Sequence, residues 1–292
     1  MTKRRILITG GTGQVGTELL RGQWASDIEL VAPTRQEFDL SDCDRIERYI
    51  AEGGFAAVIN SGAYTAVDRA EADVLTAWKV NALAPAAIAS ATKKCGIPIV
   101  HVSTDYVFDG EKKEAYVEGD PVAPLSVYGA SKEAGEQAVR TGNSYHIILR
   151  TAWVFGTTGN NFVKTMIRLG KEKPLIKVVN DQWGSPTAAV DIADILAKLT
   201  DRLINEDGTR VGTYNFVNSG TATWYQFARE IFRQLGARGL EIPALEPINT
   251  DQYPTPARRP VNSRLSTEKL RQDFGVEPRD WTVALQQILW SL

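Results

Sequence analysis

The 292-residue chain has little of what several classes of protein require. It contains two cysteines and two histidines, too few for a disulfide framework, and their positions show no zinc-ligand spacing. Its formal net charge of -2 lacks the basic excess of proteins that coat nucleic acids or bind membrane surfaces. We therefore expect neither nucleic acid nor a membrane as a partner, although a local basic cluster could still bind an anionic small molecule.

No long apolar run marks a signal peptide or a membrane span. Basic residues precede apolar ones in the opening "MTKRRILITGG", but the apolar run is short and ends in glycines. The stretch is therefore interpreted as a first β-strand. We expect no transmembrane segment and a cytoplasmic location.

Apolar and β-branched runs recur along the first half of the chain. They are nearly continuous in apolar residues, which is typical of strands covered on both faces. They lie at positions 5–9, 28–32, 56–60, 97–103 and 146–150. Helix-forming segments such as 73–94 and 128–140 lie between them. This alternation predicts right-handed βαβ units and a doubly wound parallel sheet of the Rossmann type.

The alternation loosens past the fifth run, which predicts a second, smaller α/β domain at the C-terminal end. We expect residues 1–155 to form the first domain and residues 156–292 mainly the second, with elements near 175–220 returning to the first. Further elements are expected as helices near 162–171, 188–201 and 224–235 and as short strands at "IKVVN" and "TYNFVN". Five prolines between Leu240 and Pro260 indicate a loop.

A glycine-rich turn, "TGGTGQVGTELL", follows the first strand directly. Its glycines fit G-x-G-x-x-G from Gly11, and G-x-x-G-x-x-G from Gly10. Such a turn brings the backbone close to a pyrophosphate and points a helix N-terminus at the anion. A plain tight turn is the alternative, but the motif lies between a strand and a helix, as a dinucleotide site requires. We predict that the first domain binds NAD(P) through Gly10, Gly13, Gln14, Val15 and Gly16.

The end of the second strand lacks the acidic residue that usually bonds the adenosine ribose. The chain reads "LVAPTRQEF" there, so Thr34 and Arg35 stand at this position. Arg35 could face a 2′-phosphate, which predicts a preference for NADP(H) or use of both coenzymes; a solvated surface arginine is the alternative. In the "FDLSD" that follows, Asp39 and Leu40 could flank the adenine, or Asp39 could cap the next helix.

A hydroxyl, a phenol and an amine are expected to meet at the carboxyl edge of the sheet. The fourth strand ends in "VHVSTDYVFDG", which brings Thr104 and Asp105 to the ligand crevice. "VYGASKEAGE" places Tyr128 and Lys132 four residues apart, on one face of a helix. A cation there would lower the pKa of Tyr128, and the group would donate a proton to a carbonyl that accepts hydride. A helix-start tyrosine with an exposed lysine is the alternative.

Together, "GGTGQVG", "STDYVFDG" and "YGASK" resemble the extended short-chain dehydrogenases/reductases. Further stretches narrow the resemblance to the dTDP-4-dehydrorhamnose reductase family, in order along nearly the whole chain. They are "NSGAYTAVDRAE" (60–71), "NALAPAAIA" (81–89), "LRTAWVFG" (149–156), "GNNFVKTM" (159–166), "NDQWGSPT" (180–187), "TATWYQFA" (221–228) and "YPTPARRPVNSRL" (253–265). The resemblance gives the catalytic roles to Tyr128, Lys132 and Thr104.

The resemblance implies an NADPH-dependent reduction of the C4 keto group of dTDP-4-dehydro-β-L-rhamnose to dTDP-L-rhamnose. Tyr128 would protonate the new alkoxide, and Asp105 would bond the sugar. Ala63, Tyr64 and Thr65 match cofactor contacts of the family, with core packing as the alternative for Tyr64. Use of NADH beside NADPH stays open.

The second domain is expected to bind most of the substrate. Trp153, just past the fifth strand, could stack on the sugar or could be a core residue. Arg259 and Asn262 match the family's R-P-x-N-S-R pattern in a proline-rich loop that suits a binding lid. Arginine there could pair with the diphosphate, or it could be solvated. Asn161 and Trp224 are further candidates for substrate contacts.

The chain departs from the family pattern at the second-strand end and at Gly62, where alanine is expected. Some family members hold a divalent cation with acidic groups at a dimer contact. Glu18 is suitably placed for this, but Val190 and the C-terminal "LWSL" offer no carboxylates. We therefore expect no metal site, in a monomer or a homodimer.

Other functions stay open. A related epimerase, or a reductase of another nucleotide 4-keto-6-deoxysugar, would share these motifs, but an epimerase would show no net consumption of NADPH. A non-catalytic regulatory subunit on the same fold is a third reading, and it predicts a degraded tyrosine–lysine pair, whereas both residues are intact here. The nucleotide base, the sugar stereochemistry and the glycan pathway are not determined by the sequence.

Overall fold

The doubly wound parallel sheet expected from the sequence is confirmed in a computed structural model that describes residues 3–206 and 210–292. The sheet has six strands in the order β10-β5-β4-β3-β1-β2, and all neighbours are parallel. They are β1 (Arg4–Thr9), β2 (Ile28–Val31), β3 (Phe55–Asn60), β4 (Ile99–Thr104), β5 (His146–Thr151) and β10 (Gly212–Asn215). The strand order reverses between β1 and β3, and ligands of such sheets bind beyond the carboxyl ends at this point.

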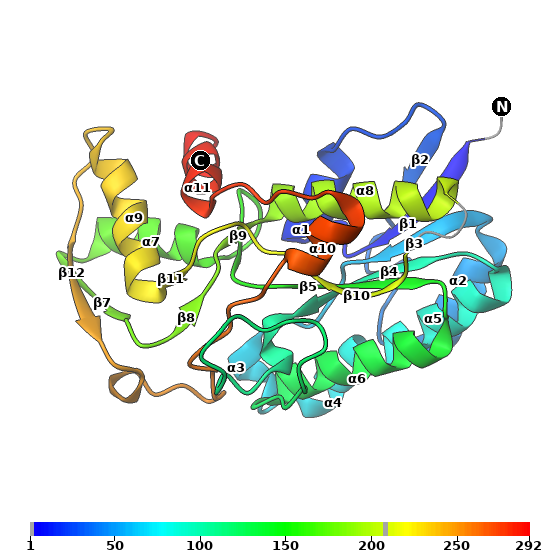
Figure 1. Cartoon of the computed structure of the whole chain (residues 1–292), viewed down its shortest axis with the longest axis horizontal. Coiled ribbons are helices and arrows are strands. Elements are labelled where there is room, and N and C mark those ends of the chain that lie inside the picture. Colours follow the sequence, from blue (N-terminus) through cyan, green and yellow to red (C-terminus); the bar gives the residue numbers. More distant parts are fainter. Residues whose placement is uncertain (1–2, 207–209) are drawn as a thin grey trace.

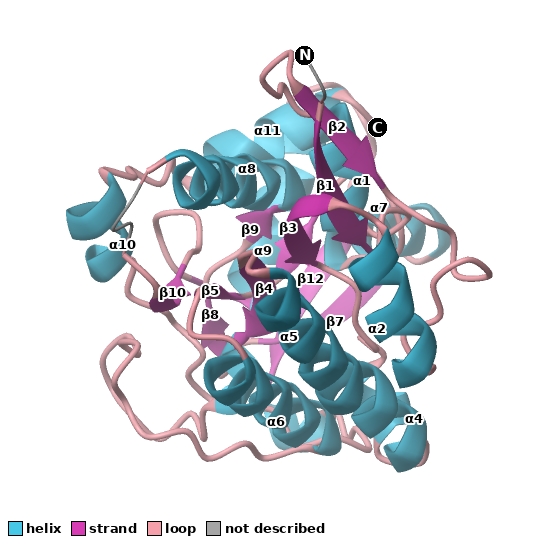
Figure 2. Ribbon diagram, turned by 90° about the vertical axis from the view of Figure 1, so that its right-hand side faces the viewer, coloured by secondary structure: helices cyan, strands magenta, loops and turns pink. Residues whose placement is uncertain are grey.

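Helices cover both faces of the sheet, as Figure 2 shows in a view along the strands. One face carries α1 (Gln14–Arg21) and α8 (Ala189–Asn205), and the other carries α2 (Cys43–Glu52), α5 (Ala84–Cys95) and α6 (Val127–Gly142). This explains the continuous apolar runs. In β1, Ile6 and Ile8 pack into the core under α8, and Leu7 packs into the core under α2 and α5.

The segment before α5 is less regular than the single helix expected over 73–94. The chain forms α3 (Val67–Ala70), α4 (Val74–Trp78) and a π-helical turn (Lys79–Leu83) before α5 begins. Val74–Cys95 is also the one helical stretch within the described residues that is long and apolar enough for a membrane span. Half of its most apolar window is buried inside the fold. It is packed against α2 and α6, as the core helix of a globular domain is.

A second lobe lies beyond the carboxyl edge of the sheet, at the left of Figure 1. It has its own apolar core, which includes Phe155, Phe227 and Trp281. Its helices are α7 (Phe162–Glu172), α9 (Trp224–Gly236) and α11 (Trp281–Trp290). Its short strands form three pairs: β7 (Leu175–Val179) with β12 (Ala244–Ile248), β8 (Trp183–Gly184) with β11 (Ala222–Thr223), and β6 (Val154–Phe155) with β9 (Thr187–Ala188).

The prediction that residues 240–260 form only a loop is wrong. Ala244–Ile248 forms β12 beside β7, and Thr250–Gln252 forms a short 3-10 helix. Pro247 is tolerated in β12 because this strand has one neighbour, so the missing N–H faces away from a ladder. The proline content of the segment concealed this edge strand.

The chain returns to the first lobe after entering the second. After the second lobe is entered, β10 adds a strand to the large sheet and α8 covers one face of it. The helix α10 (Glu268–Phe274) adds Leu270 and Phe274 to the same core. The two lobes are therefore joined by several crossings of the chain, which flank the carboxyl edge of the sheet in Figure 1.

Candidate active site

The expected hydroxyl and phenol meet at the carboxyl end of β4. Thr104 is the last residue of β4, and Asp105 begins a short 3-10 helix (Asp105–Val107). The Tyr128 phenol lies close enough to the Thr104 hydroxyl for this hydroxyl to lower its pKa. The Thr104 hydroxyl also donates to Oδ1 of Asp105 (2.9 Å). These three side chains therefore form one buried polar group, as the sequence predicts.

The start of α6 is built to bring Tyr128 close to β4. Ser126 caps the helix by accepting the N–H of Gly129 (3.2 Å). Gly129 lies against the carbonyl oxygen of Tyr106, and a Cβ at that position would overlap this oxygen. Glycine at this position therefore lets the first turn of α6 approach the loop after β4. The Tyr106 and Tyr128 rings then meet edge to face, with centroids 5.5 Å apart.

The phenol is not acidified in this structure, contrary to the expectation from the Tyr–Lys spacing. Burial raises the pKa of Tyr128 to about 12, the neighbouring Thr104 hydroxyl opposes this, and the nearby Asp105 carboxylate adds to it. The Lys132 ammonium donates to the carbonyl of Val102 (2.7 Å) and does not pair with the phenol. The helical spacing places both groups on one face, but the depth of burial decides the pKa.

Lys132 is itself deeply buried, with 2% of its surface exposed. Burial lowers the pKa of its amine to about 8, and the negative charge of Glu136 opposes this effect. The alternative of an exposed lysine is thus contradicted by its position. At neutral pH the amine is mostly protonated, and it can donate to hydroxyls of a bound ligand.

Asp105 has a carboxylate oxygen suited to a ligand hydroxyl. Burial raises the pKa of this carboxyl to about 6, although the hydroxyls of Ser263 and Thr104 act to lower it. Within the described residues, its Oδ2 is buried and has no partner at hydrogen-bonding geometry. The Ser263 hydroxyl donates instead to the carbonyl of Trp183 (3.3 Å). A buried unpaired acceptor costs free energy, so a donating ligand group fits this position.

The glycine turn has the form that a pyrophosphate requires. Gly10 has φ +69°, and the N–H of Gly13 donates to its carbonyl (2.8 Å). Gly13 then caps α1 without any side-chain hydrogen bond, so the first-turn N–H groups have no side-chain cap. A Cβ on Gly16 would overlap the Gly10 carbonyl oxygen. The turn therefore keeps α1 tight against β1, with its N-terminus at the switch point of the sheet.

The end of β2 presents an exposed arginine. The Arg35 side chain is 80% exposed, with Nε 3.9 Å from Oδ2 of Asp39. Thr34 is held by Glu37, which accepts from its N–H (2.8 Å) and its hydroxyl (2.9 Å). Asp39 accepts from the N–H and hydroxyl of Ser41 and does not cap the next helix. Arg35 is therefore free to meet a ligand at this end of the crevice.

Asp42 and Leu40 hold the helix and the loop next to the end of β2. Asp42, and not Asp39, caps α2 by accepting the N–H of Arg45 (3.1 Å). Leu40 lies against Gly62, where a Cβ would come within 2.7 Å of its Cδ1. Glycine in place of the expected alanine thus suits the packing of Leu40 in this chain.

The loop after β3 is held by a side chain from the π-helical turn. Asn81 accepts the N–H of Tyr64 (2.8 Å) and donates to its carbonyl (3.0 Å) and to the Ser131 hydroxyl (3.0 Å). The Tyr64 ring packs in a small cluster with Ala70, Ala77 and Tyr128. Ala63 is half-buried and Thr65 is exposed, so both retain surface that a ligand could contact. The Tyr64 ring therefore packs in this cluster and lies next to Tyr128.

Trp153 is stacked on another indole. The Trp153 and Trp224 rings lie 3.5 Å apart and are nearly parallel at 7°. Trp153 is the one non-glycine residue in the described ranges with positive φ (48°), a conformation that costs about 1–3 kcal/mol for such a residue. Gly184 also lies against this indole, which a Cβ at that position would overlap. A ligand that stacks on Trp153 therefore has to move Trp224 or use the ring edge.

Asn161 joins the second lobe to the glycine turn. It caps α7 by accepting the N–H of Lys164 (3.1 Å). Its Nδ2 donates to Oε1 of Gln14 (2.9 Å) and to the carbonyl of Gly156 (2.8 Å). Val15, the next residue of α1, packs against the large core. Asn161 thus lies at the edge of the cofactor turn, and its amide is engaged within the fold.

Arg259 is paired within the chain. Its guanidinium donates to both oxygens of Asp68 on α3, with Nη1 at 3.0 Å and Nη2 at 2.7 Å. Its charge also acts on Tyr106, whose ring lies beside Tyr128. Asp68 is a residue that the sequence did not indicate, because it lies 191 positions away. The loop containing Arg259 therefore already reaches the active-site crevice.

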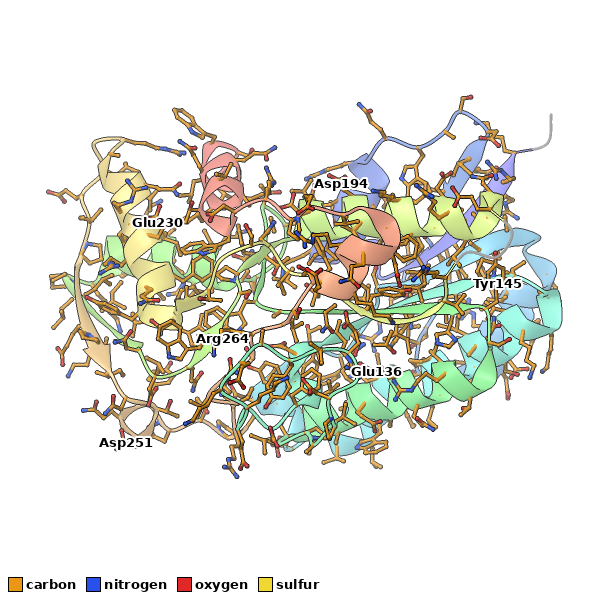
Figure 3. All side chains as sticks on the ribbon, in the orientation of Figure 1. Glu136, Tyr145, Asp194, Glu230, Asp251 and Arg264 are labelled. Carbon is orange, nitrogen blue, oxygen red and sulfur yellow. The ribbon has the colours of Figure 1, made fainter. Side chains whose placement is uncertain are left out.

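Asn262 has a structural role in this loop. Its amide donates to the carbonyls of Lys112 and Glu114 (2.7 Å each) and accepts Nε of Arg264 (2.8 Å). Arg264 also donates to the carbonyl of Lys113. Figure 3 shows Arg264 at the junction of the two lobes. Asn262 and Arg264 thus fix the 112–114 loop. Their hydrogen bonds leave no free group on the Asn262 amide.

The structure gives no support for a metal centre. Among residues 3–206 and 210–292 there is no group of three or more histidine, cysteine, aspartate or glutamate side chains that could hold an ion. Glu18 lies beside Arg21 and Thr157 at the end of α1. The absence of a metal site therefore stays a prediction of the sequence.

Known proteins resemble this chain over its whole length. The model of the family described as "RmlD substrate binding domain" matches residues 4–292. The dTDP-4-dehydrorhamnose reductase of Aggregatibacter actinomycetemcomitans is 41% identical over 97% of this chain and 98% of its own.

Solved structures agree. The dTDP-4-dehydrorhamnose reductase structure from Clostridium acetobutylicum is 39% identical, with a TM-score of 0.92 and coverage of 98% of this chain and 99% of that one. The structure of the same enzyme from Bacillus anthracis, in complex with NADP, is 34% identical, with a TM-score of 0.92 and full coverage of both chains.

Proposed function

The chain belongs to the dTDP-4-dehydrorhamnose reductase family, and we propose that Tyr128, Lys132 and Thr104 perform its chemistry. The reaction is the NADPH-dependent reduction of the C4 keto group of dTDP-4-dehydro-β-L-rhamnose to dTDP-L-rhamnose. One observation carries the assignment of the residues. The Tyr128 phenol is buried at the end of β4, near the Thr104 hydroxyl and the Asp105 carboxylate, whose Oδ2 is unpaired.

The cofactor site proposed here fits the chain's own geometry. The uncapped first turn of α1 and the close approach of Gly16 to Gly10 suit a pyrophosphate. Further residues proposed to hold the coenzyme are Gly13, Gln14, Val15, Thr34, Arg35, Asp39, Leu40, Ala63, Tyr64 and Thr65. When bound, NADPH supplies the hydride for the sugar carbonyl.

Tyr128 holds the proton that the new alkoxide needs. With its pKa at about 12, the phenol stays protonated at neutral pH, which is the state that a proton donor requires. The Thr104 hydroxyl fixes the direction of the phenol and stabilises the phenolate that remains after transfer. Lys132, whose ammonium lies one helical turn further on, binds the nicotinamide ribose and adds positive charge to the site.

The substrate is proposed to lie between the lobes, with its sugar on Asp105. The free Oδ2 of Asp105 accepts a sugar hydroxyl, and the Trp153–Trp224 stack provides an aromatic wall. Arg259 is proposed to exchange Asp68 for the diphosphate, because both are anions that accept two parallel hydrogen bonds from one guanidinium. Asn161 and Asn262 then act by holding the surrounding loops.

This arrangement gives the two lobes different binding roles. We propose that the Rossmann lobe binds the coenzyme and that the smaller lobe mainly binds the dTDP-sugar. The net charge of -2 supports action without nucleic acid or a membrane as a partner. We also propose that the protein holds no metal and is a cytoplasmic monomer or homodimer. The mass of the protein in solution measures the oligomeric state.

A cofactor balance tests the function. The protein is mixed with substoichiometric NADPH and dTDP-4-dehydro-L-rhamnose, and NADPH loss is compared with the sugar formed. We expect one NADPH consumed for each dTDP-L-rhamnose. Sugar conversion without net loss of NADPH would identify an epimerase, and reduction only of other 4-keto-6-deoxysugars would change the substrate.

We expect Arg35→Asp to reverse or weaken the preference for NADPH. A charged hydrogen bond to a 2′-phosphate is worth about 1.5–3 kcal/mol, so the NADPH-to-NADH ratio of kcat/KM should fall about 10–100-fold. Arg48→Asp, the same charge change at an exposed position of α2, is the control. An unchanged ratio in Arg35→Asp would remove Arg35 from the coenzyme site.

We also expect kcat/KM to be bell-shaped in pH, with limbs near 6 and near 8. Asp105, with a pKa of about 6, loses its charge as the pH falls through that value and accepts sugar hydroxyls less well. Lys132, with a pKa of about 8, loses its charge as the pH rises. Both losses reduce activity. The pH profile of the residual activity of Asp105→Asn should lack the acid limb. An acid limb that persists in this variant would belong to another titrating group.

A further inference from the structure

A fully buried carboxylate, Glu136, lies one helical turn beyond Lys132 on α6 and is marked in Figure 3. Arg150 donates to it through Nε (2.9 Å) and Nη2 (2.7 Å), Arg140 through Nη1 (2.9 Å), and Ser103 through Oγ (2.6 Å). Arg150 is equally hidden, with 3% of its side chain exposed. Apolar residues of similar volume often stabilise a fold as well as a buried ion pair does. Stability alone is therefore a weak reason for this group.

The hydroxyl that bonds Glu136 belongs to the strand that holds the active site. Ser103 lies between Val102, whose carbonyl accepts the Lys132 ammonium, and Thr104, whose hydroxyl lies near the catalytic phenol. Val102 and Ser103 are thus hydrogen-bonded to α6, and Thr104 lies near its first turn. Glu136 supplies the contact furthest along the helix and so sets how α6 lies against β4.

Arg150 extends the same contact to β5. It lies opposite Ser103 in the parallel register, and its guanidinium stacks over the Phe108 ring at 5.0 Å. Trp153 follows three residues later, at the start of the second lobe. One carboxylate therefore joins the helix with the phenol and amine to both strands that lead into the crevice.

The charge of Glu136 also acts on Lys132. It opposes the lowering of the Lys132 pKa by burial. Two other ionisable groups lie near: His101 on β4, which feels the Lys132 charge, and Tyr128, one turn earlier on the same helix. Burial and the Lys132 charge lower the pKa of His101, so both groups are neutral at neutral pH. The positive charge of Arg150 on β5 is balanced by the carboxylate of Glu136, with which it forms an ion pair.

We propose that Glu136 is a positioning residue of the reduction, which fixes α6, and with it Tyr128 and Lys132, against β4 and β5. The inference rests on the proposed roles of Tyr128 and Lys132. A shift of a catalytic group by about 1 Å can cost about 100-fold in rate. Removal of the Glu136 charge should therefore change both the rate and its pH dependence.

Glu136→Gln keeps the shape of the side chain and removes its charge. We expect kcat, normalised to the fraction of protein that binds NADPH, to fall about 10–100-fold. We also expect the alkaline limb of its pH profile to move to lower pH. Glu133→Gln is the matched control, since Glu133 is next to Lys132 in sequence and also bonds Arg140 (3.4 Å), but is 27% exposed. It should leave the rate and the limb unchanged.

Glu136→Gln leaves Arg150 buried without a counter-charge, so Glu136→Gln/Arg150→Gln is prepared beside it and carries the same prediction. An alkaline limb that stays at its wild-type pH in the folded variants would overturn the proposal, whatever the rate. Failure of both variants to fold would assign Glu136 a structural role only, and would also overturn it. Absence of reduction by the wild-type protein would instead refute the proposed function, and this inference with it.

Discussion

Tyr128→Phe should lower kcat by about 10²–10⁴-fold, because it removes the proton donor and leaves the ring in place. The ring packs against Tyr106 and the small cluster around Ala77, and these contacts do not need the hydroxyl. We therefore expect little change in the affinity for NADPH or in the free energy of unfolding. Steady-state kinetics with saturating NADPH, together with a coenzyme titration, measure both quantities.

Tyr49→Phe is the matched control for the loss of a phenol. Tyr49 lies on α2 and packs against Phe38 and Phe55, away from the carboxyl edge of β4. Its variant should keep the wild-type kcat. Near-wild-type turnover by Tyr128→Phe would mean that another group, or water, protonates the alkoxide, and would end the assignment of Tyr128.

Gly16→Ala should weaken NADPH binding about 10–100-fold. The added Cβ would overlap the carbonyl oxygen of Gly10, and its Gly11 neighbour would lie only 2.7 Å away, so α1 must move away from the turn. Such overpacking costs about 1–3 kcal/mol, and a loss of this size in binding corresponds to the stated change in Kd. Part of the cost should also appear as a lower free energy of unfolding.

Gly22→Ala tests whether this effect belongs to the turn. Gly22 follows the other end of α1, and a Cβ there would lie 3.4 Å from its nearest neighbours, which is an ordinary contact. We expect its Kd for NADPH to match that of the wild type. If Gly16→Ala binds NADPH as tightly as Gly22→Ala does, the pyrophosphate does not lie on this turn.

The sequence predicted those parts of the fold that depend on local patterns. The continuous apolar runs and the glycine turn identified the strands and the crevice, because both features are encoded by neighbouring residues. The strand β12 was missed because its edge position, which tolerates Pro247, is a tertiary property. The same limit explains the pKa of Tyr128: the spacing to Lys132 is local, whereas the burial that raises the pKa is not.

The site contains further contacts that no local pattern could indicate. Arg259 meets Asp68 across 191 positions of the chain, and Trp153 meets Trp224 across the second lobe. The sequence named three of these residues but not their partners, and so could not show that the arginine and the indole are already engaged. Glu136, by contrast, had a local signal, since it follows Lys132 by four residues in a motif-bearing helix.

The most direct test follows a deuterium label from the coenzyme. NADPH carrying deuterium at both C4 positions of the nicotinamide is incubated with the protein and dTDP-4-dehydro-L-rhamnose, and the product is examined by NMR. Direct reduction at the Tyr128 site predicts one deuterium at C4 of the rhamnose in the wild-type reaction, and about 10²–10⁴-fold slower labelling with Tyr128→Phe. Product without deuterium at C4, or labelled equally fast by the variant, would contradict the account.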